Sequence, residues 1–194
     1  MVGTVRWRRG VTGSRSSAFA RLMAEDHAED RNVLAGQPAY VALRERDRAR
    51  REAVTVLLAD GWPDQADGLY AAAWILNHGD LTEEAALASR LATRAADLGH
   101  PGARWLAAAA FDRSLMYAGL PQKYGTNIVP DGIGYRLWDV DPATTDAERQ
   151  ANGVPVLAVM QARAAAITAP QPDMAGASES LRKAMRRWGT LPPE

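Results

Sequence analysis

Apolar residues recur every three or four positions along most of this chain, which is the spacing of amphipathic α-helices. Gly and Pro residues interrupt the pattern at intervals that suit helix ends. Together these signals predict helices over residues 16–34, 38–59, 63–77, 80–98, 101–118, 145–152, 155–168 and 178–188. Asp80 is followed three residues later by Glu83, and this spacing resembles a capping box at the start of the fourth helix.

The helical pattern disappears between Thr126 and Trp138. Ile128-Val129 and the stretch 135–138 have strand-like composition, and Pro130-Asp131-Gly132 between them is typical of a turn. We therefore expect an all-α, single-domain antiparallel helical bundle with one irregular loop or small hairpin insertion around 122–138.

The two ends of the chain differ from this middle part. Residues 1–16 form a basic leader, 17–170 are expected to form the helical domain, and 171–194 combine a Pro-containing linker with a basic amphipathic helix. Within the second helix, the run from Arg44 to Glu52 interleaves acids with arginines, which favours a solvated face over an RNA-binding arm.

One helical stripe breaks the expected pattern. Trp105, Ala108, Asp112, Leu115 and Met116 share a face, so a carboxylate lies among apolar side chains. Asp is rarely buried without a partner, which makes Asp112 a candidate for a structural or functional role.

Directly after this helix, residues 122–127 form a dense run of hydrogen-bonding side chains. The run contains Gly125, a residue that can adopt a left-handed backbone conformation. We therefore expect a functional site in this loop, next to the carboxylate of Asp112.

Composition narrows the chemistry. The chain of 194 residues has Cys 0, which excludes disulfides, thiol nucleophiles and cysteine-based zinc or iron–sulfur sites. Its three histidines are far apart in sequence, so we expect neither a metal site nor a cofactor. Lys+Arg and Asp+Glu both count 23, giving no strong nucleic-acid signal. No apolar stretch is long enough to form a transmembrane segment. The basic N-terminus is not followed by the apolar run that a secretory signal needs, so we expect a cytoplasmic location.

Familiar catalytic signatures are missing: there is no Walker loop, Rossmann glycine fingerprint, zincin motif or nucleophile elbow. The remaining polar residues at helix ends and in the 122–127 loop are the candidates. We expect His78 and Asp112 to serve as catalytic acid and base, and the following residues to bind substrate: Arg113, Gln122, Tyr124, Thr126 and Arg149.

Each candidate also has a structural interpretation. His78 suits a helix C-terminal cap, and Asp112 suits a buried pair with Arg113 or Arg149. Gln122 and Tyr124 could satisfy backbone groups of their own loop. For Arg149, the structural alternative is an ion pair with Asp112 or with Asp146.

The order of these motifs resembles an uncharacterised bacterial all-α domain family, over about residues 40 to 157. The resemblance rests on these motifs: Gly61-Trp62-Pro63, His78 with Asp80, Asp112-Arg113, Gln122 with Tyr124-Gly125-Thr126, and Arg149 with Gly153. The chain departs from the family pattern at Asn77, Gly79 and Asn127, where the family tends to have Gln, Ala and Gln. The resemblance implies a shared polar pocket but no particular reaction.

Three functional hypotheses follow. The first is a cofactor-independent enzyme of lyase, isomerase or hydrolase type that acts on a small molecule or peptide by His/Asp acid–base chemistry. The second is a binding module for a peptide or protein that performs no chemistry. The third is binding of nucleic acid or a membrane surface through the basic ends. The sequence does not predict the oligomeric state.

Overall fold

The computed structural model describes residues 12–33 and 35–192. In order, the elements are α1 (Thr12–His27), α2 (Pro38–Ala59), α3 (Ala66–Leu76), α4 (Thr82–Asp97), α5 (Ala103–Tyr117), β1 (Ile128–Pro130), β2 (Tyr135–Leu137), α6 (Asp146–Ala151), α7 (Leu157–Ala165), η1 (Met174–Gly176) and α8 (Glu179–Trp188). The prediction of an all-α fold with a small hairpin insertion is confirmed.

The main core lies between α3, α4 and α5, and small side chains dominate it. Each of these helices buries a run or stripe of alanines, such as Ala71, Ala72 and Ala73 on α3. Small residues at helix contacts allow the backbones to approach closely. Larger side chains, including Leu69, Leu91 and Leu106, fill the remaining space.

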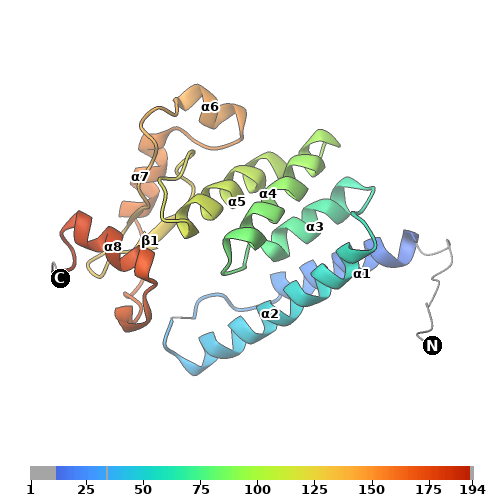
Figure 1. Cartoon of the computed structure of the whole chain (residues 1–194), viewed down its shortest axis with the longest axis horizontal. Coiled ribbons are helices and arrows are strands. Elements are labelled where there is room, and N and C mark those ends of the chain that lie inside the picture. Colours follow the sequence, from blue (N-terminus) through green and yellow to red (C-terminus); the bar gives the residue numbers. More distant parts are fainter. Residues whose placement is uncertain (1–11, 34, 193–194) are drawn as a thin grey trace.

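Helices α1 and α2 cover the other side of α3 (Figure 1). Phe19 of α1 and Val54 of α2 enter the main core, where both are almost fully buried. Consequently α3 is enclosed on two sides, and its C-terminal end lies between α2 and α5.

The hairpin and the last three helices form the other end of the molecule (Figure 1). The two strands are antiparallel, with Ile128 opposite Leu137 and Pro130 opposite Tyr135. One face of β2 packs on α7. On the opposite face, the basic helix α8 docks through its apolar stripe, where Trp138 meets the ring of Trp188 edge-on with centroids 5.7 Å apart.

Several predicted helix boundaries are wrong: α1 begins at Thr12 and not at residue 16, α3 begins at Ala66 and not at residue 63, and α7 ends at Ala165 and not at residue 168. The first helix ends at His27 and not near residue 34. The residues that follow are non-helical, and Glu29 and Arg31 among them bind charged side chains of α2. At the start of α4 the capping carboxylate is that of Glu84, which accepts hydrogen bonds from the backbone N–H groups of Asp80 and Leu81. Glu83, which the sequence suggested, does not play this role.

The predicted division into leader, helical domain and C-terminal segment stays a prediction. Residues 1–11 of the leader lie outside the described residues, and α1 already begins at Thr12. Across the described ranges, none of the helices combines the length and the apolar character needed to cross a membrane.

Candidate functional site

The C-terminal end of α3 is surrounded by polar side chains from α2 and α5. The last carbonyl groups of an α-helix have no partner within the helix. Arg44 Nη1 donates to the carbonyl oxygen of His78 at 3.0 Å, and Arg51 Nη1 donates to the same oxygen at 3.3 Å. These two arginines from α2 therefore cap the turn after α3, and their charge complements the negative end of the helix dipole.

The same turn is held from α5 on its other side. Arg113 Nη1 donates to the carbonyl of Asn77, and the hydroxyl of Tyr117 donates to the carbonyl of Gly79 at 2.8 Å. Among the described residues, no carboxylate lies within ion-pair distance of Arg113. Burial lowers the pKa of its guanidinium, as expected for a cation removed from water without a counter-charge.

His78 lies in this turn, and its imidazole faces α1. Its Nε2 is 3.4 Å from Asp26 Oδ2, which is within ion-pair range, although the two groups are not aligned as a regular hydrogen bond. The ring meets Trp74 edge-on with centroids 5.7 Å apart. The His78 side chain remains 20% exposed. One nitrogen of the imidazole is thus held against a carboxylate while part of the ring stays accessible.

Asp26 itself is almost fully buried, with 1% of its surface exposed. Its Oδ2 accepts a hydrogen bond from Trp74 Nε1 at 2.8 Å, and its Oδ1 pairs with Arg31. Burial alone would raise the pKa of this carboxyl, but the nearby imidazole of His78, the hydrogen bond from Trp74 and the charge of Arg31 lower it to about 2. Asp26 is therefore ionised at neutral pH despite its burial.

A second buried carboxylate, Asp47, lies beside Asp26. Arg31 Nη2, which pairs with Asp26, is also 3.1 Å from Asp47 Oδ1, and Arg50 Nη2 donates to the same oxygen at 2.8 Å. Burial would raise the pKa of Asp47, yet these hydrogen bonds hold it below its ordinary value. We call the connected set the ionic cluster: Asp26, Glu29, Arg31, Arg44, Asp47, Arg50 and His78.

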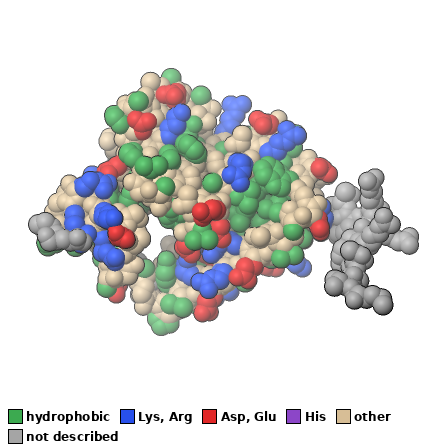
Figure 2. All heavy atoms as spheres, viewed as in Figure 1, with side chains coloured by type: hydrophobic (Ala, Val, Ile, Leu, Met, Phe, Trp, Pro, Cys, Tyr) green, Lys and Arg blue, Asp and Glu red, His purple; other side chains and the backbone are tan. Residues whose placement is uncertain are grey.

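This arrangement corrects the expectation that the run from Arg44 to Glu52 is a solvated face. Asp47, Arg50 and Arg51 are all less than a tenth exposed. Figure 2 shows acidic and basic side chains gathered in the depression between α2 and the α4–α5 pair, next to an apolar area. The charges on α2 therefore belong largely to an internal network.

Asp112 has a different environment, made of backbone donors. Its Oδ1 accepts hydrogen bonds from the N–H groups of Lys123 and Tyr124 at 2.7 and 2.8 Å. Its Oδ2 accepts from the N–H and the hydroxyl of Thr126 at 3.0 and 2.8 Å. Asp112 is 0% exposed, and burial raises the pKa of its carboxyl against the opposing effect of these four bonds. It forms neither of the ion pairs, with Arg113 or with Arg149, that we considered from the sequence.

Gly125 makes this loop geometry feasible. Its φ of +83° lies in the left-handed region, which turns the chain so that the residues on both sides of it donate to Asp112. A Cβ at this position would lie 3.4 Å from Leu157 Cδ1, which is about van der Waals contact, so the cost of a larger residue comes from the left-handed backbone.

Gln122 completes the fixation of the loop and is 0% exposed. Its Nε2 donates to the carbonyls of Asn127 and Trp138, at 3.1 and 2.9 Å, and its Oε1 accepts from Asn127 N–H at 2.8 Å. The amide thus satisfies loop backbone groups, as its structural interpretation suggested. We call this second set the loop centre: Asp112, Gln122, Tyr124, Thr126 and Asn127.

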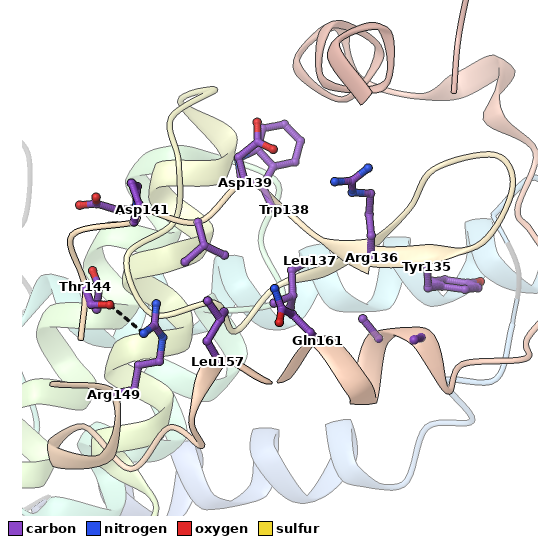
Figure 3. Close-up of a pocket in the computed structure, with 14 residues that line it drawn as sticks. Tyr135, Arg136, Leu137, Trp138, Asp139, Asp141, Thr144, Arg149, Leu157 and Gln161 are labelled. Atoms are coloured by element: carbon purple, nitrogen blue, oxygen red, sulfur yellow. Dashed lines mark hydrogen bonds between the residues drawn. The ribbon is translucent and has the colours of Figure 1, made fainter. Parts of the chain in front are cut away.

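Arg149 lies at the edge of the loop centre and is 2% exposed. Its Nε donates to the carbonyl of Tyr124 at 3.0 Å, and its Nη1 donates to Thr144 O at 2.8 Å and to Asp146 Oδ1 at 3.1 Å. Figure 3 shows the guanidinium between Thr144 and Leu157, at one end of a pocket. Of the two ion pairs weighed for Arg149, the structure contains the one with Asp146.

The candidate residues therefore divide between two centres. Asp112, Gln122, Tyr124 and Thr126 belong to the loop centre, whereas His78 belongs to the ionic cluster. Arg113 bridges them, because it donates to Asn77 next to His78 and, through Nε at 3.3 Å, to Asn127 of the loop centre. Whether any of these residues binds or converts a substrate stays a prediction.

The residues that surround His78, namely Asp26, Arg31 and Asp47, were not predicted from the sequence. A signal for Asp47 was present: Leu43, Asp47, Arg50 and Val54 follow helical spacing, so the apolar stripe of α2 passes through charged residues. For Asp26 and Arg31 we find no comparable signal, since both lie in an ordinary charged run.

No group of three or more His, Asp or Glu side chains within residues 12–33 and 35–192 is placed to hold a metal ion. Comparison with protein-family models, with curated proteins and with solved structures gives no match for this chain. The resemblance to a bacterial domain family consequently rests on the order of its motifs alone.

Proposed function

We propose that this protein is a cofactor-independent enzyme in which His78 is the general acid or base and Asp26 is the residue that positions it. The observation that carries the proposal is the approach of His78 Nε2 to the buried, ionised carboxylate of Asp26, on a ring that remains partly exposed. A carboxylate in this position fixes the orientation of an imidazole and stabilises the imidazolium that forms during proton transfer.

Trp74 and Arg31 support this role by fixing Asp26. Trp74 and Arg31 occupy both carboxylate oxygens, so Asp26 cannot turn away from the imidazole without losing a hydrogen bond. With Nε2 directed to Asp26, Nδ1 is the nitrogen left for a substrate, and it makes no hydrogen bond to any residue in the described part of the chain. The proton exchanged with the substrate is therefore assigned to Nδ1.

The charges around the turn suggest the kind of substrate. Arg113 lies against the residue that precedes His78 and lacks a carboxylate counter-charge among the described residues. A buried cation without a counter-charge favours a substrate oxygen that is negatively charged or becomes negatively charged in the transition state. Lyase, isomerase and hydrolase reactions of small polar molecules or peptides all develop such charge.

The assignment of Asp112 changes in this proposal. All four of its hydrogen bonds go to the loop, and its side chain has no exposed surface for a proton donor or acceptor to reach. We therefore give Asp112 the role of holding the loop, and assign the carboxylate of the acid–base pair to Asp26.

A substrate panel with matched variants tests the proposal. Small carboxylic acids, phosphate esters, lactones and short peptides are incubated with the protein, and conversion is followed by proton NMR. Turnover by the wild type is expected to fall at least about 100-fold in His78→Gln, the usual size of a general acid–base contribution, and to fall also in Asp26→Asn. Glu25→Gln is the control, because it removes an exposed carboxylate next to Asp26 whose ion pair is with Arg21 on the helix surface.

Unchanged turnover in His78→Gln would contradict the mechanism. Binding of a panel member without conversion would instead favour the binding-module hypothesis.

The basic ends give weaker support to the nucleic-acid hypothesis. On α8, Arg187 pairs with Asp139 and Lys183 pairs with Glu179, which reduces the free positive charge of this helix. We therefore expect that any affinity for DNA or RNA in a binding assay does not fall steeply as the salt concentration rises.

A further inference from the structure

A pocket of about 480 Å³ lies between the stretch from β2 to α6 on one side and α7 on the other. It is separate from the ionic cluster, since none of the cluster residues lines it. Figure 3 shows the strand running above α7, with Arg149 at one end of the space between them. This pocket takes no part in the proposed acid–base chemistry.

The lining is apolar along the middle of the pocket. Side chains alternate along a strand, so Tyr135 and Leu137 face α7 while Arg136 and Trp138 face α8. Arg136 accordingly stacks over the ring of Trp188 at 4.2 Å. Leu137, Leu157 and the alanines at the end of α7 provide the apolar surface that remains.

The apolar space ends at a buried cation. Arg149 uses Nε and Nη1 for its hydrogen bonds, and its Nη2 makes none to any residue that the structure describes. Its ion-pair partner Asp146 is half exposed to solvent, with 52% of its side chain accessible. A guanidinium that is nearly buried and has one donor nitrogen directed to a cavity suits an anionic oxygen there.

The acidic residues that line the pocket already form ion pairs or hydrogen bonds with other parts of the chain. Asp139 pairs with Arg187 and accepts a hydrogen bond from Trp188 Nε1 at 2.6 Å. Asp141 accepts from the N–H of Ala143 at 2.9 Å, within its own turn. Asp141 still carries a charge at the rim, so it opposes an anion that enters the pocket.

From this combination we propose that the pocket binds a carboxylate carried on a short aliphatic chain, with the carboxylate on Arg149 Nη2 and the chain between Leu137 and Leu157. A phosphate ester would place more charge near Asp141 than a carboxylate does. An uncharged chain would leave the Nη2 donor without an acceptor.

The test uses hexanoate, with hexanol and hexylamine as probes of the same chain length. Binding is followed by NMR, and the Nε–H signal of Arg149 reports directly on the proposed contact because this group is buried and hydrogen-bonded. Hexanoate is expected to shift this signal and to bind at least about tenfold more tightly than hexanol, since it alone forms a charge-assisted hydrogen bond. Hexylamine is expected not to shift it.

Variants separate the site from general effects on folding. Ala165→Leu, which fills the pocket at an exposed lining position, should abolish the hexanoate shift, whereas Ala166→Leu, one residue further and outside the lining, should preserve it. Asp141→Asn removes the opposing charge and should tighten hexanoate binding severalfold. Arg149→Lys should weaken it, and its amide spectrum checks that the chain is folded.

Equal affinity for hexanoate and hexanol would overturn the proposal, as would hexanoate binding that survives Ala165→Leu. The proposal is independent of the acid–base mechanism, because His78→Gln is expected to bind hexanoate as the wild type does.

Discussion

The loop centre and the ionic cluster both bury carboxylates among helices, but they satisfy them in different ways. Asp112 of the loop centre receives its hydrogen bonds from three backbone N–H groups and one hydroxyl, all within residues 123–126. Asp26 of the ionic cluster is held by titratable or charged side chains from three other segments. The first arrangement fixes one loop conformation. The second can change its charge, which is what acid–base chemistry requires.

The largest expected difference between the centres is in stability. Asp112→Asn keeps the side-chain size but leaves one oxygen where two accepted four hydrogen bonds, so buried N–H groups lose their acceptor. We expect the free energy of unfolding to fall by about 3 kcal/mol or more. Urea denaturation measures it. Asp97→Asn is the matched control at an exposed position of α4, and an equal loss in both variants would contradict a structural role for Asp112.

Acid should affect the two centres in opposite directions. The folded-state pKa of Asp26 is about 2, below its ordinary 3.8, so its contribution is complete above about pH 4 and is lost as the pH falls through 2. This loss is on the order of 2 kcal/mol. The pKa of Asp112 is raised by burial, so its protonation as the pH falls favours the folded state and opposes this loss.

Urea denaturation at pH 5, 3 and 2 checks this contrast. Asp26→Asn should flatten the decline in stability, whereas Asp112→Asn should make it steeper, because the carboxyl whose protonation favours the folded state is gone. A decline of the same size in wild type and Asp26→Asn would place the acid-sensitive groups elsewhere.

Thr126 allows a smaller test of the loop centre. Thr126→Val preserves the shape of the side chain and the backbone N–H that bonds to Asp112, but removes the hydroxyl donor. The free energy of unfolding should fall by about 1 kcal/mol, the usual net contribution of one hydrogen bond. Thr93→Val on the exposed face of α4, which loses only a bond to its own helix, is the comparison.

The smallest effect on stability is expected for His78→Gln. The imidazole is partly exposed and its Nε2 lacks a well-aligned hydrogen bond, so the free energy of unfolding should change by about 1 kcal/mol or less, although turnover is lost. Thermal unfolding measures the change. A loss as large as that of Asp112→Asn would mean that His78 is a structural member of its cluster.

Local sequence signals predicted the helices and the hairpin because caps, Gly and Pro residues, and apolar spacing act within a few positions. The buried Asp112 was visible for the same reason: it interrupts a stripe on its own helix. Its partners were not, because the bonds to residues 123–126 depend on how the chain turns after α5. The carboxylate that faces His78 lies on another helix, 52 residues earlier in the chain, so no local pattern could connect the two.

The orientation of the His78 imidazole tests the central claim most directly. Long-range proton–nitrogen NMR spectra of labelled protein identify which ring nitrogen carries the proton in the neutral form, and His27 and His100 serve as internal references. The proposed pairing with Asp26 places the proton on Nε2 and leaves Nδ1 free, and this preference should be lost in Asp26→Asn. A proton on Nδ1 in the wild type, or the same tautomer mixture in both proteins, would contradict it.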